Sequence, residues 1–156
     1  MKNREALRYK QQLDDLFLKI TAVGVYIEMK SHWAKYLCIR VSGFLEVSIR
    51  SIYIEYCKNK SAPFIANYIE KKLTSFQNPT MPKILDLVRS FNPPWADELE
   101  KFTEGEIKDS IVSIVATRNK IAHGENVGIT FTKISNYYEN SVLLVEFLEE
   151  QCLRSP

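Results

Sequence analysis

The sequence predicts an all-α protein, a helical bundle in which long antiparallel helices are joined by shorter connecting helices. Apolar residues recur at spacings of three and four over long segments. Prolines and glycines cluster between these segments and are nearly absent within them. Only one short stretch, ENVGITF at 125–131, has a pattern that allows extended chain. No break is long enough to act as a flexible linker, so residues 1–156 are predicted to form one domain.

The first two predicted helices are long. Residues 3–29 place leucine, isoleucine and phenylalanine at helical spacing with charged residues between them, which is typical of an amphipathic helix. Residues 33–59 form the most apolar predicted helix, and we expect it at the centre of the bundle. Gly43 lies within it, where a missing side chain permits close approach by a neighbouring helix.

Shorter pieces follow, each introduced by proline or a capping residue. Ser61 is a candidate N-cap, with Pro63 in the first turn of the helix that follows it. Pro82 lies in the first turn of another short helix, which continues through Phe91. After NPPW, a short irregular or helical piece leads through Phe102.

Two further helices complete the prediction. Thr103 and Glu106 have the spacing of a capping box, so a helix is expected to begin there and to run to His123. Gly124 is placed as the C′ residue that ends it. Thr132 is the expected cap of the last helix, which continues almost to the end of the chain.

The composition argues against several classes of protein. A net charge of +2 is too small to indicate a nucleic-acid-binding protein by itself. The three cysteines are far apart and show no Cys-x-x-Cys spacing, so neither a disulfide framework nor a zinc site is indicated. The first twenty residues lack the apolar run of a secretory signal. Charged residues interrupt the most apolar helix and make it a costly membrane span. We therefore expect a cytoplasmic protein without metal, cofactor or membrane association.

The segment TRNKIAHG, residues 117–124, concentrates polar chemistry in one turn. On a helix Asn119 and His123 lie on one face, because four residues separate them. Arg118 lies about 140° from His123 around the helix axis, so it needs its long side chain to reach the same place. Helix C-termini also carry arginine and histidine for purely structural reasons, and this alternative stays open from the pattern alone.

An imidazole beside a guanidinium is suited to phosphate chemistry. Histidine can exchange a proton near neutral pH, and arginine offers a permanent charge with fork geometry for phosphate oxygens. RNA carries its own nucleophile, the 2′-hydroxyl, so an enzyme need only move protons and stabilise charge on the phosphate. The sequence has two histidines and no acidic cluster with ligand spacing, so metal catalysis is disfavoured.

RNKIAHG near the end of the next-to-last long helix resembles the signature of the HEPN superfamily, which is arginine, four to six residues, then histidine. SGFLEVSIRSIYIEYCKNKS, two short helices and VATRNKIAHG together are similar to the RiboL-PSP-HEPN type, over about residues 33–150. The resemblance implies an HEPN-like helical bundle. It also implies a metal-independent endoribonuclease that cleaves single-stranded RNA to a 2′,3′-cyclic phosphate, commonly as a toxin or defence effector.

Carried onto this chain, the resemblance assigns the two signature positions to Arg118 and His123, and the usual polar companion to Asn119. It also implies a homodimer in which both copies of the motif line one cleft, and a possible antitoxin or nucleotidyltransferase partner. Some relatives carry a tyrosine two residues past the histidine, which such a partner modifies. Here that residue is Glu125, which puts control by this route in doubt and could either repel phosphate or hold the imidazole.

Glu46 and Arg50 form a second polar set, one helical turn apart in the apolar helix. An internal ion pair that fixes helix packing is the favoured interpretation. The alternative is that either side chain supports Arg118 and His123. Four other cations could contact phosphate or simply keep the surface solvated: Lys58, Lys60, Lys71 and Lys72.

Two other functions remain open. The first is a non-catalytic HEPN module for dimerisation or partner binding, in which the motif is a structural turn. The second is binding of a nucleotide or another phosphorylated ligand at the basic turn.

Overall fold

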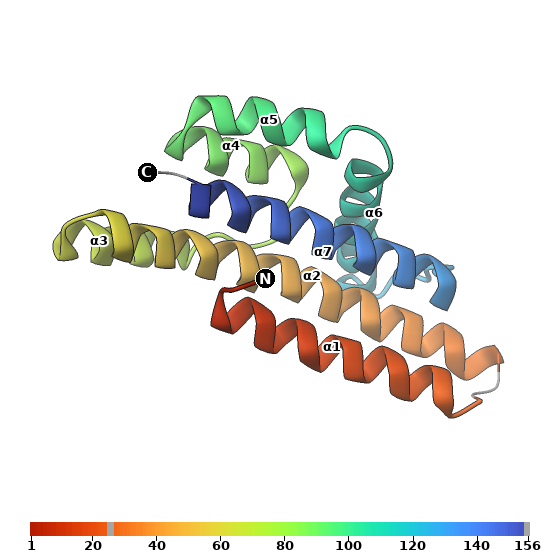
Figure 1. Ribbon diagram of the computed structural model, residues 1–156. Coiled ribbons are helices and arrows are strands. Elements are labelled where there is room, and N and C mark those ends of the chain that lie inside the picture. Colours follow the sequence, from red (N-terminus) through yellow and green to blue (C-terminus); the bar gives the residue numbers. More distant parts are fainter. Residues whose placement is uncertain (25–26, 155–156) are drawn as a thin grey trace.

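The computed structural model describes residues 1–24 and 27–154, and this part of the chain folds into seven α-helices without a strand (Figure 1). The prediction of an all-α protein is confirmed. The helices are α1 (Arg4–Ala22), α2 (Ile27–Lys60), α3 (Pro63–Leu73), α4 (Met81–Phe91), α5 (Pro93–Thr103), α6 (Glu106–Ala122) and α7 (Phe131–Arg154).

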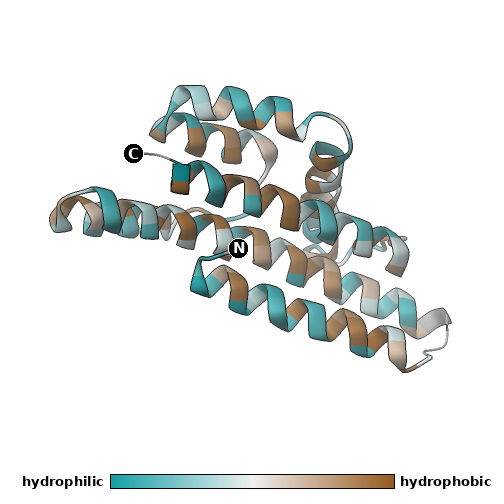
Figure 2. Ribbon diagram, viewed as in Figure 1, coloured by the Kyte–Doolittle hydropathy of each residue, from teal (hydrophilic) through white to brown (hydrophobic). Residues whose placement is uncertain are grey.

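Helix α2 is the central element, and it packs against α1, α3, α6 and α7. Helix α1 runs antiparallel to α2, α7 runs parallel to α2, and α6 is steeply inclined to all three (Figure 1). Hydrophobic and hydrophilic stretches alternate along α1, as expected for a helix with one buried face (Figure 2). The largest fully buried side chains of α2 include Phe44 and Tyr53, which supports the predicted central position of this helix.

The first helix ends earlier than predicted. It stops at Ala22, and the following Gly24 has a φ of +55°, a left-handed conformation that suits glycine and ends a helix. The prediction of one helix over 3–29 was therefore wrong beyond Ala22, and residues 25–26 lie outside the described part. Helix α2 starts at Ile27, several residues before the predicted start.

The caps of the short helices were predicted in part. The Ser61 hydroxyl donates to the carbonyl of Cys57 at 2.7 Å, so it belongs to the end of α2, and Ala62 is the N-cap of α3. Pro63 and Pro82 occupy the first turns of α3 and α4, as predicted. The segment after NPPW was expected to be short and possibly irregular, but it is a regular helix, α5.

The predicted capping box of α6 is absent. Thr103 is the last residue of α5, and its hydroxyl donates to the carbonyl of Leu99 at 2.9 Å. Gly105, with a φ of +87°, is the N-cap instead. At α7 the cap is also shifted by two residues, because the Thr130 hydroxyl accepts a hydrogen bond from the backbone N–H of Lys133. Residues 125–130 are irregular.

The predicted close approach at Gly43 is confirmed. A Cβ atom on this residue would lie 2.7 Å from the hydroxyl oxygen of Tyr9 on α1. A larger residue at this position would require the Tyr9 side chain to move away from α2. Separately, none of the described helices combines the length and the apolar character needed to cross a bilayer.

Candidate active site at the end of α6

The motif lies where α6 ends. His123 is the C-cap, and Gly124 follows with a φ of +73°. The backbone N–H of Gly124 donates to the carbonyl of Ile121 at 3.0 Å, and that of Glu125 donates to the carbonyl of Lys120 at 2.9 Å. These two bonds form a Schellman motif, so the predicted role of Gly124 as the C′ residue is confirmed. The turn holds the Cα of His123 in a defined position while its side chain is exposed.

Asn119 and His123 belong to a solvent-facing strip of α6. Val112, Ala116, Asn119 and His123 fall within about 60° of one another around the helix axis. Val112 is 50% exposed, Ala116 and His123 are exposed, and Asn119 is half-buried. This face therefore combines exposed apolar side chains with polar motif residues, a composition suited to contact with another protein surface.

Arg118 reaches this strip from the side. Its Nη1 donates to Oδ1 of Asn119 at 3.2 Å, and the side chain is half-buried. This is the one hydrogen bond or ion pair of the Arg118 side chain within the described residues. The remaining donors of the guanidinium can therefore serve another acceptor, such as a phosphate oxygen.

The His123 imidazole makes no hydrogen bond or ion pair with the described residues, although its backbone N–H is bonded within the turn. Glu125, whose role was left open, has an exposed side chain that forms no ion pair with His123. Both side chains are thus available to solvent. The nearby loop is tied to α2, because Lys35 Nζ donates to Oδ1 of Asn126 at 3.4 Å.

A groove beside the motif brings in residues that the sequence analysis did not select. It lies between α6, residues 126–129 and the start of α7, and it is lined by Ser113, Thr117, Lys120, Lys133 and Tyr137 among others. Lys120 and Lys133 are both exposed. Lys120 could have been selected from the sequence, because it lies within the motif. Lys133 belongs to another helix, and only the packing of α7 on α6 places it in this groove.

The second predicted polar set does not form as expected. A Glu46 carboxylate oxygen accepts the backbone N–H of Asn78 at 3.1 Å, in the connection before α4. Arg50 forms no ion pair with it among the described residues, so the predicted internal ion pair is absent. Neither side chain hydrogen-bonds to Arg118, Asn119 or His123. Asn78 has a φ of +53°, so Glu46 serves to hold an unusual backbone turn.

The strongly shifted ionisable groups lie in the core, away from the motif. Burial raises the pKa of the Cys38 thiol to about 12 and has the same effect on Cys152. Burial also raises the pKa of Tyr138, whose hydroxyl donates to Asp14 at 2.7 Å. All three cysteines are buried and none forms a disulfide. Among the described residues, no group of three or more His, Cys, Asp or Glu side chains could hold a metal ion.

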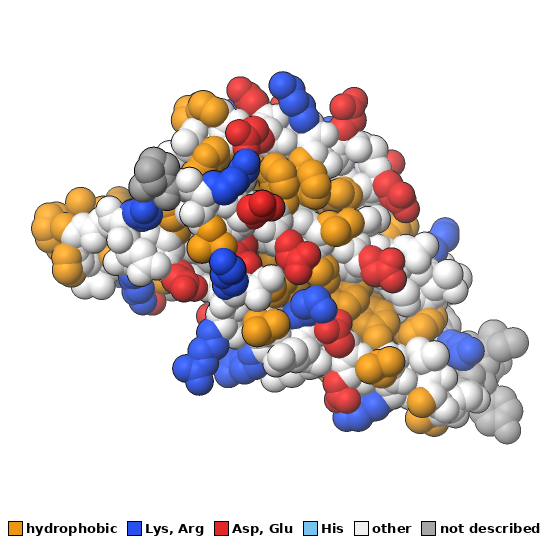
Figure 3. Space-filling model, viewed as in Figure 1, with side chains coloured by type: hydrophobic (Ala, Val, Ile, Leu, Met, Phe, Trp, Pro, Cys, Tyr) orange, Lys and Arg blue, Asp and Glu red, His pale blue; other side chains and the backbone are white. Residues whose placement is uncertain are grey.

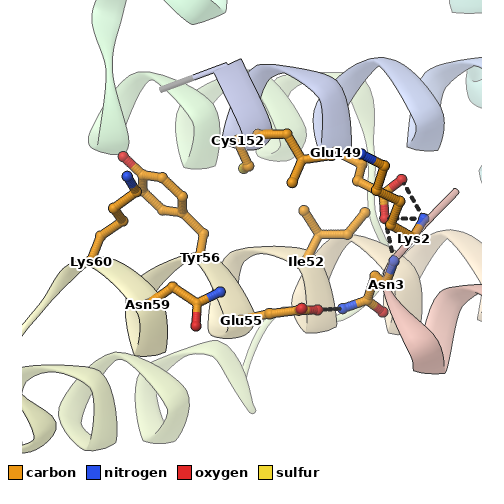
Figure 4. Close-up of a pocket in the computed structure, with 10 residues that line it drawn as sticks. Lys2, Asn3, Ile52, Glu55, Tyr56, Asn59, Lys60, Glu149 and Cys152 are labelled. Carbon is orange, nitrogen blue, oxygen red and sulfur yellow. Dashed lines mark hydrogen bonds between the residues drawn. The ribbon is translucent and has the colours of Figure 1, made fainter. Parts of the chain in front are cut away.

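A small pocket between α2, α7 and the N-terminal segment is a weaker candidate site (Figure 4). Its buried carboxylate, Glu149, accepts the backbone N–H of Lys2 at 2.7 Å and also that of Asn3. The Asn3 side chain in turn donates to Glu55. The buried Glu149 carboxylate is thus occupied by the chain's own amides, and it fastens the N-terminal segment to α7.

The family model described as RiboL-PSP-HEPN matches residues 4–154, nearly the whole chain. The match includes α1, which the sequence resemblance had not covered. No curated protein and no solved structure matches significantly.

Proposed function

Because the chain belongs to the RiboL-PSP-HEPN family, whose membership indicates a nuclease-type or related function, we propose that it is a metal-independent endoribonuclease. Its proposed substrate is single-stranded RNA. The proposed products are one strand with a 2′,3′-cyclic phosphate and one with a 5′-hydroxyl. The supporting observation is that Arg118, Asn119 and His123 share one solvent-accessible helix end, where the His123 imidazole has no hydrogen-bond or ion-pair partner among the described residues.

The proposed reaction needs two proton transfers and no added nucleophile. The 2′-oxygen attacks the adjacent phosphorus, the new P–O2′ bond forms, and the P–O5′ bond breaks. A base takes the 2′-hydroxyl proton, and an acid gives a proton to the departing 5′-oxygen. His123 fits either role, because its imidazole is exposed and unpaired within the described residues.

Arg118 is the proposed stabiliser of phosphate charge. The hydrogen bond to Asn119 already orients its guanidinium, so less conformational entropy is lost when RNA binds. The free donors of the guanidinium would bind the non-bridging oxygens, whose charge develops in the transition state. Asn119 is a positioning residue in this scheme, because it acts through Arg118.

A homodimer would supply both the acid and the base. One His123 per protomer can fill one role at a time, so two copies around one phosphate complete the reaction. The exposed strip of Val112 and Ala116 next to Asn119 and His123 offers a surface for such pairing across a twofold axis. The dimer remains part of the proposal.

The direct test is cleavage of a labelled single-stranded RNA in EDTA. We expect wild-type protein to produce 2′,3′-cyclic phosphate ends, which are detected by mass spectrometry of the products. His123→Ala and Arg118→Ala should each reduce the rate at least about 100-fold, the lower range for loss of an acid–base or charge-stabilising group. Their melting temperatures should stay close to the wild-type value, because His123 is exposed and Arg118 has a single neighbouring partner.

Lys101→Gln is a suitable control, because Lys101 is an exposed cation on α5. Its cleavage rate should equal that of wild type. Equal activity in all variants would point to a contaminating nuclease and overturn the proposal. A wild-type protein that dimerises but cleaves no RNA would favour the non-catalytic module.

A toxin or defence role, and restraint by an antitoxin or nucleotidyltransferase, are further parts of the proposal. Induced expression should arrest growth for wild type and leave it unchanged for His123→Ala at equal protein level. Arrest by both proteins would argue against RNA cleavage as its cause.

A further inference from the structure

Helix α3 presents an outward face that the proposed active site does not use. Phe64 is 74% exposed and Tyr68 is 62% exposed. Phe64, Tyr68, Lys71 and Lys72 fall within about 100° of one another around the helix axis, opposite the buried Ala66 and Leu73. We call these four outward residues the α3 platform.

The platform projects from the bundle. Helix α3 packs chiefly against α2 and extends beyond the end of α7 (Figure 1). Hydrophobic side chains gather at this end of the molecule, with lysine or arginine side chains close by (Figure 3). Large exposed aromatic side chains cost solvation free energy, so their concentration on one helix face indicates a binding surface.

The charges on this helix favour an anionic occupant. Its single acid, Glu70, is paired with Lys58 of α2 at 2.8 Å. Lys71 and Lys72 have no carboxylate partner among the described residues. The Lys72 ammonium lies 5.4 Å from the centre of the Tyr68 ring, so a cation and an aromatic face already meet there.

Exposed rings next to lysines that lack a carboxylate partner among the described residues suit single-stranded nucleic acid, whose bases stack on aromatic side chains while its phosphates contact cations. Phe64 and Tyr68 are one helical turn apart, a rise of about 6 Å along the axis, so each ring is available to a different base. An apolar peptide partner would use the rings and leave both lysines without a role. A membrane is a poorer fit, because the rings occupy one turn of a short helix.

We propose that the α3 platform binds single-stranded RNA outside the cleavage site, with bases stacked on Phe64 and Tyr68 and phosphates at Lys71 and Lys72. This inference rests on the proposed function, because it takes RNA as the substrate. It makes the platform a second contact along the same strand. A long RNA can therefore use it, whereas a very short one held at α6 cannot.

The test measures binding without cleavage. A fluorescent 30-nucleotide 2′-O-methyl RNA lacks the attacking hydroxyl, so wild-type protein can be titrated with it and followed by anisotropy. Phe64→Ala and Tyr68→Ala should each weaken binding by about fivefold or more, the lower range for loss of one base-stacking contact. Leu18→Ala removes a similarly exposed apolar side chain from α1 and should leave affinity unchanged.

The lysines have a separate readout. Lys71→Gln with Lys72→Gln should reduce the slope of log affinity against log salt by about 1.4, or about 0.7 for each lost phosphate contact. With cleavable RNA, the platform variants should raise KM for a 30-nucleotide substrate and leave that of a five-nucleotide substrate unchanged. Circular dichroism melts should show that all variants are folded.

Unchanged affinity in both aromatic variants would overturn the platform and leave the ribonuclease proposal standing if wild type still cleaves. Failure of wild type to cleave, with RNA binding that still depends on the rings, would remove the ribonuclease and retain the platform. Failure of wild type to bind RNA would overturn the platform. Loss of a dimer in the aromatic variants, seen by sedimentation velocity, would assign the face to a second copy and also overturn it.

Discussion

Nη1 of Arg118 donates a hydrogen bond to Oδ1 of Asn119 at 3.2 Å, between two residues adjacent in the sequence. Adjacent helical residues point about 100° apart, so the guanidinium must fold around the helix to make this contact. The bond thereby brings the charge of Arg118 toward the face that carries His123. It connects a structural observation with the proposed cleavage, and it can be tested by changing Asn119 alone.

Asn119→Ala should lower RNA cleavage about fivefold, because loss of one hydrogen bond of about 1 kcal/mol leaves Arg118 less well positioned. Asn119→Asp keeps an acceptor for Arg118 but adds a negative charge beside the phosphate, so it should lose more activity than the alanine variant. Steady-state rates at several RNA concentrations check this order. An alanine variant as active as wild type would contradict the positioning role.

Gly124→Ala should destabilise the protein by about 1 kcal/mol, the lower range for placing a side chain in the left-handed region. Gly124 has a φ of +73°, whereas Gly128 in the same connection shows no such conformation and has open space around its Cα. Gly128→Ala is therefore the matched control. Urea unfolding measures both, and equal stability in the two variants would contradict the assigned turn.

The effect of Gly43→Ala on the free energy of unfolding should depend on the residue at position 9. In wild type the added methyl meets the Tyr9 hydroxyl at 2.7 Å, which offsets the better helix propensity of alanine. In a Tyr9→Phe background the hydroxyl is gone, so the same substitution should stabilise the protein by about 1 kcal/mol. A double-mutant cycle from thermal or urea unfolding gives the coupling between the two positions. A coupling free energy of zero would mean that α1 and α2 accommodate the added methyl group without a clash with Tyr9.

The buried thiols should make the protein less stable in alkali. Burial raises the pKa of Cys38 and Cys152 from 9.0 to about 12, so between these values the unfolded chain releases protons that the folded protein keeps. The free energy of unfolding should therefore fall as pH rises above 9, by up to about 1.4 kcal/mol per pH unit for each thiol. Urea unfolding from pH 8 to 10.5 should show a shallower slope for Cys38→Ala with Cys152→Ala. Equal slopes would contradict the shift.

Glu125→Gln should increase affinity for RNA severalfold. The side chain is exposed near His123 and forms no ion pair with it, so its charge acts mainly on the approaching phosphates. The gain should shrink as salt is raised, because salt screens exposed charges. KM at two salt concentrations measures it. A large fall in activity would instead assign Glu125 a part in holding the imidazole.

Prediction from sequence succeeded where the determining interactions are local. Pro63 and Pro82 lie in first turns because proline lacks the N–H that a first turn leaves unpaired. Gly124 ends α6 because glycine enters the left-handed region without strain. The proposed site was selected by the same kind of reasoning, since Arg118, Asn119 and His123 lie within two turns of one helix.

Prediction failed where a side chain had more than one possible partner. Thr103 and Glu106 have capping-box spacing, yet the Thr103 hydroxyl bonds back into α5. Glu46 could have paired with Arg50 one turn away, but it binds the Asn78 amide, which the chain brings in from another segment. Competing hydrogen bonds of similar free energy are decided by geometry that spacing does not specify.

The sequence by itself determined the helical class, most of the helix positions and the grouping of Arg118, Asn119 and His123, because helical periodicity and backbone preferences act over a few residues. The tertiary structure alone decided that His123 is exposed, that Lys133 lines the same groove as Lys120, and that the rings of α3 face outward. Exposure and the meeting of distant side chains depend on which helix faces pack together. The free energy of burying the whole core decides which faces pack, and no single segment contains enough information to specify it.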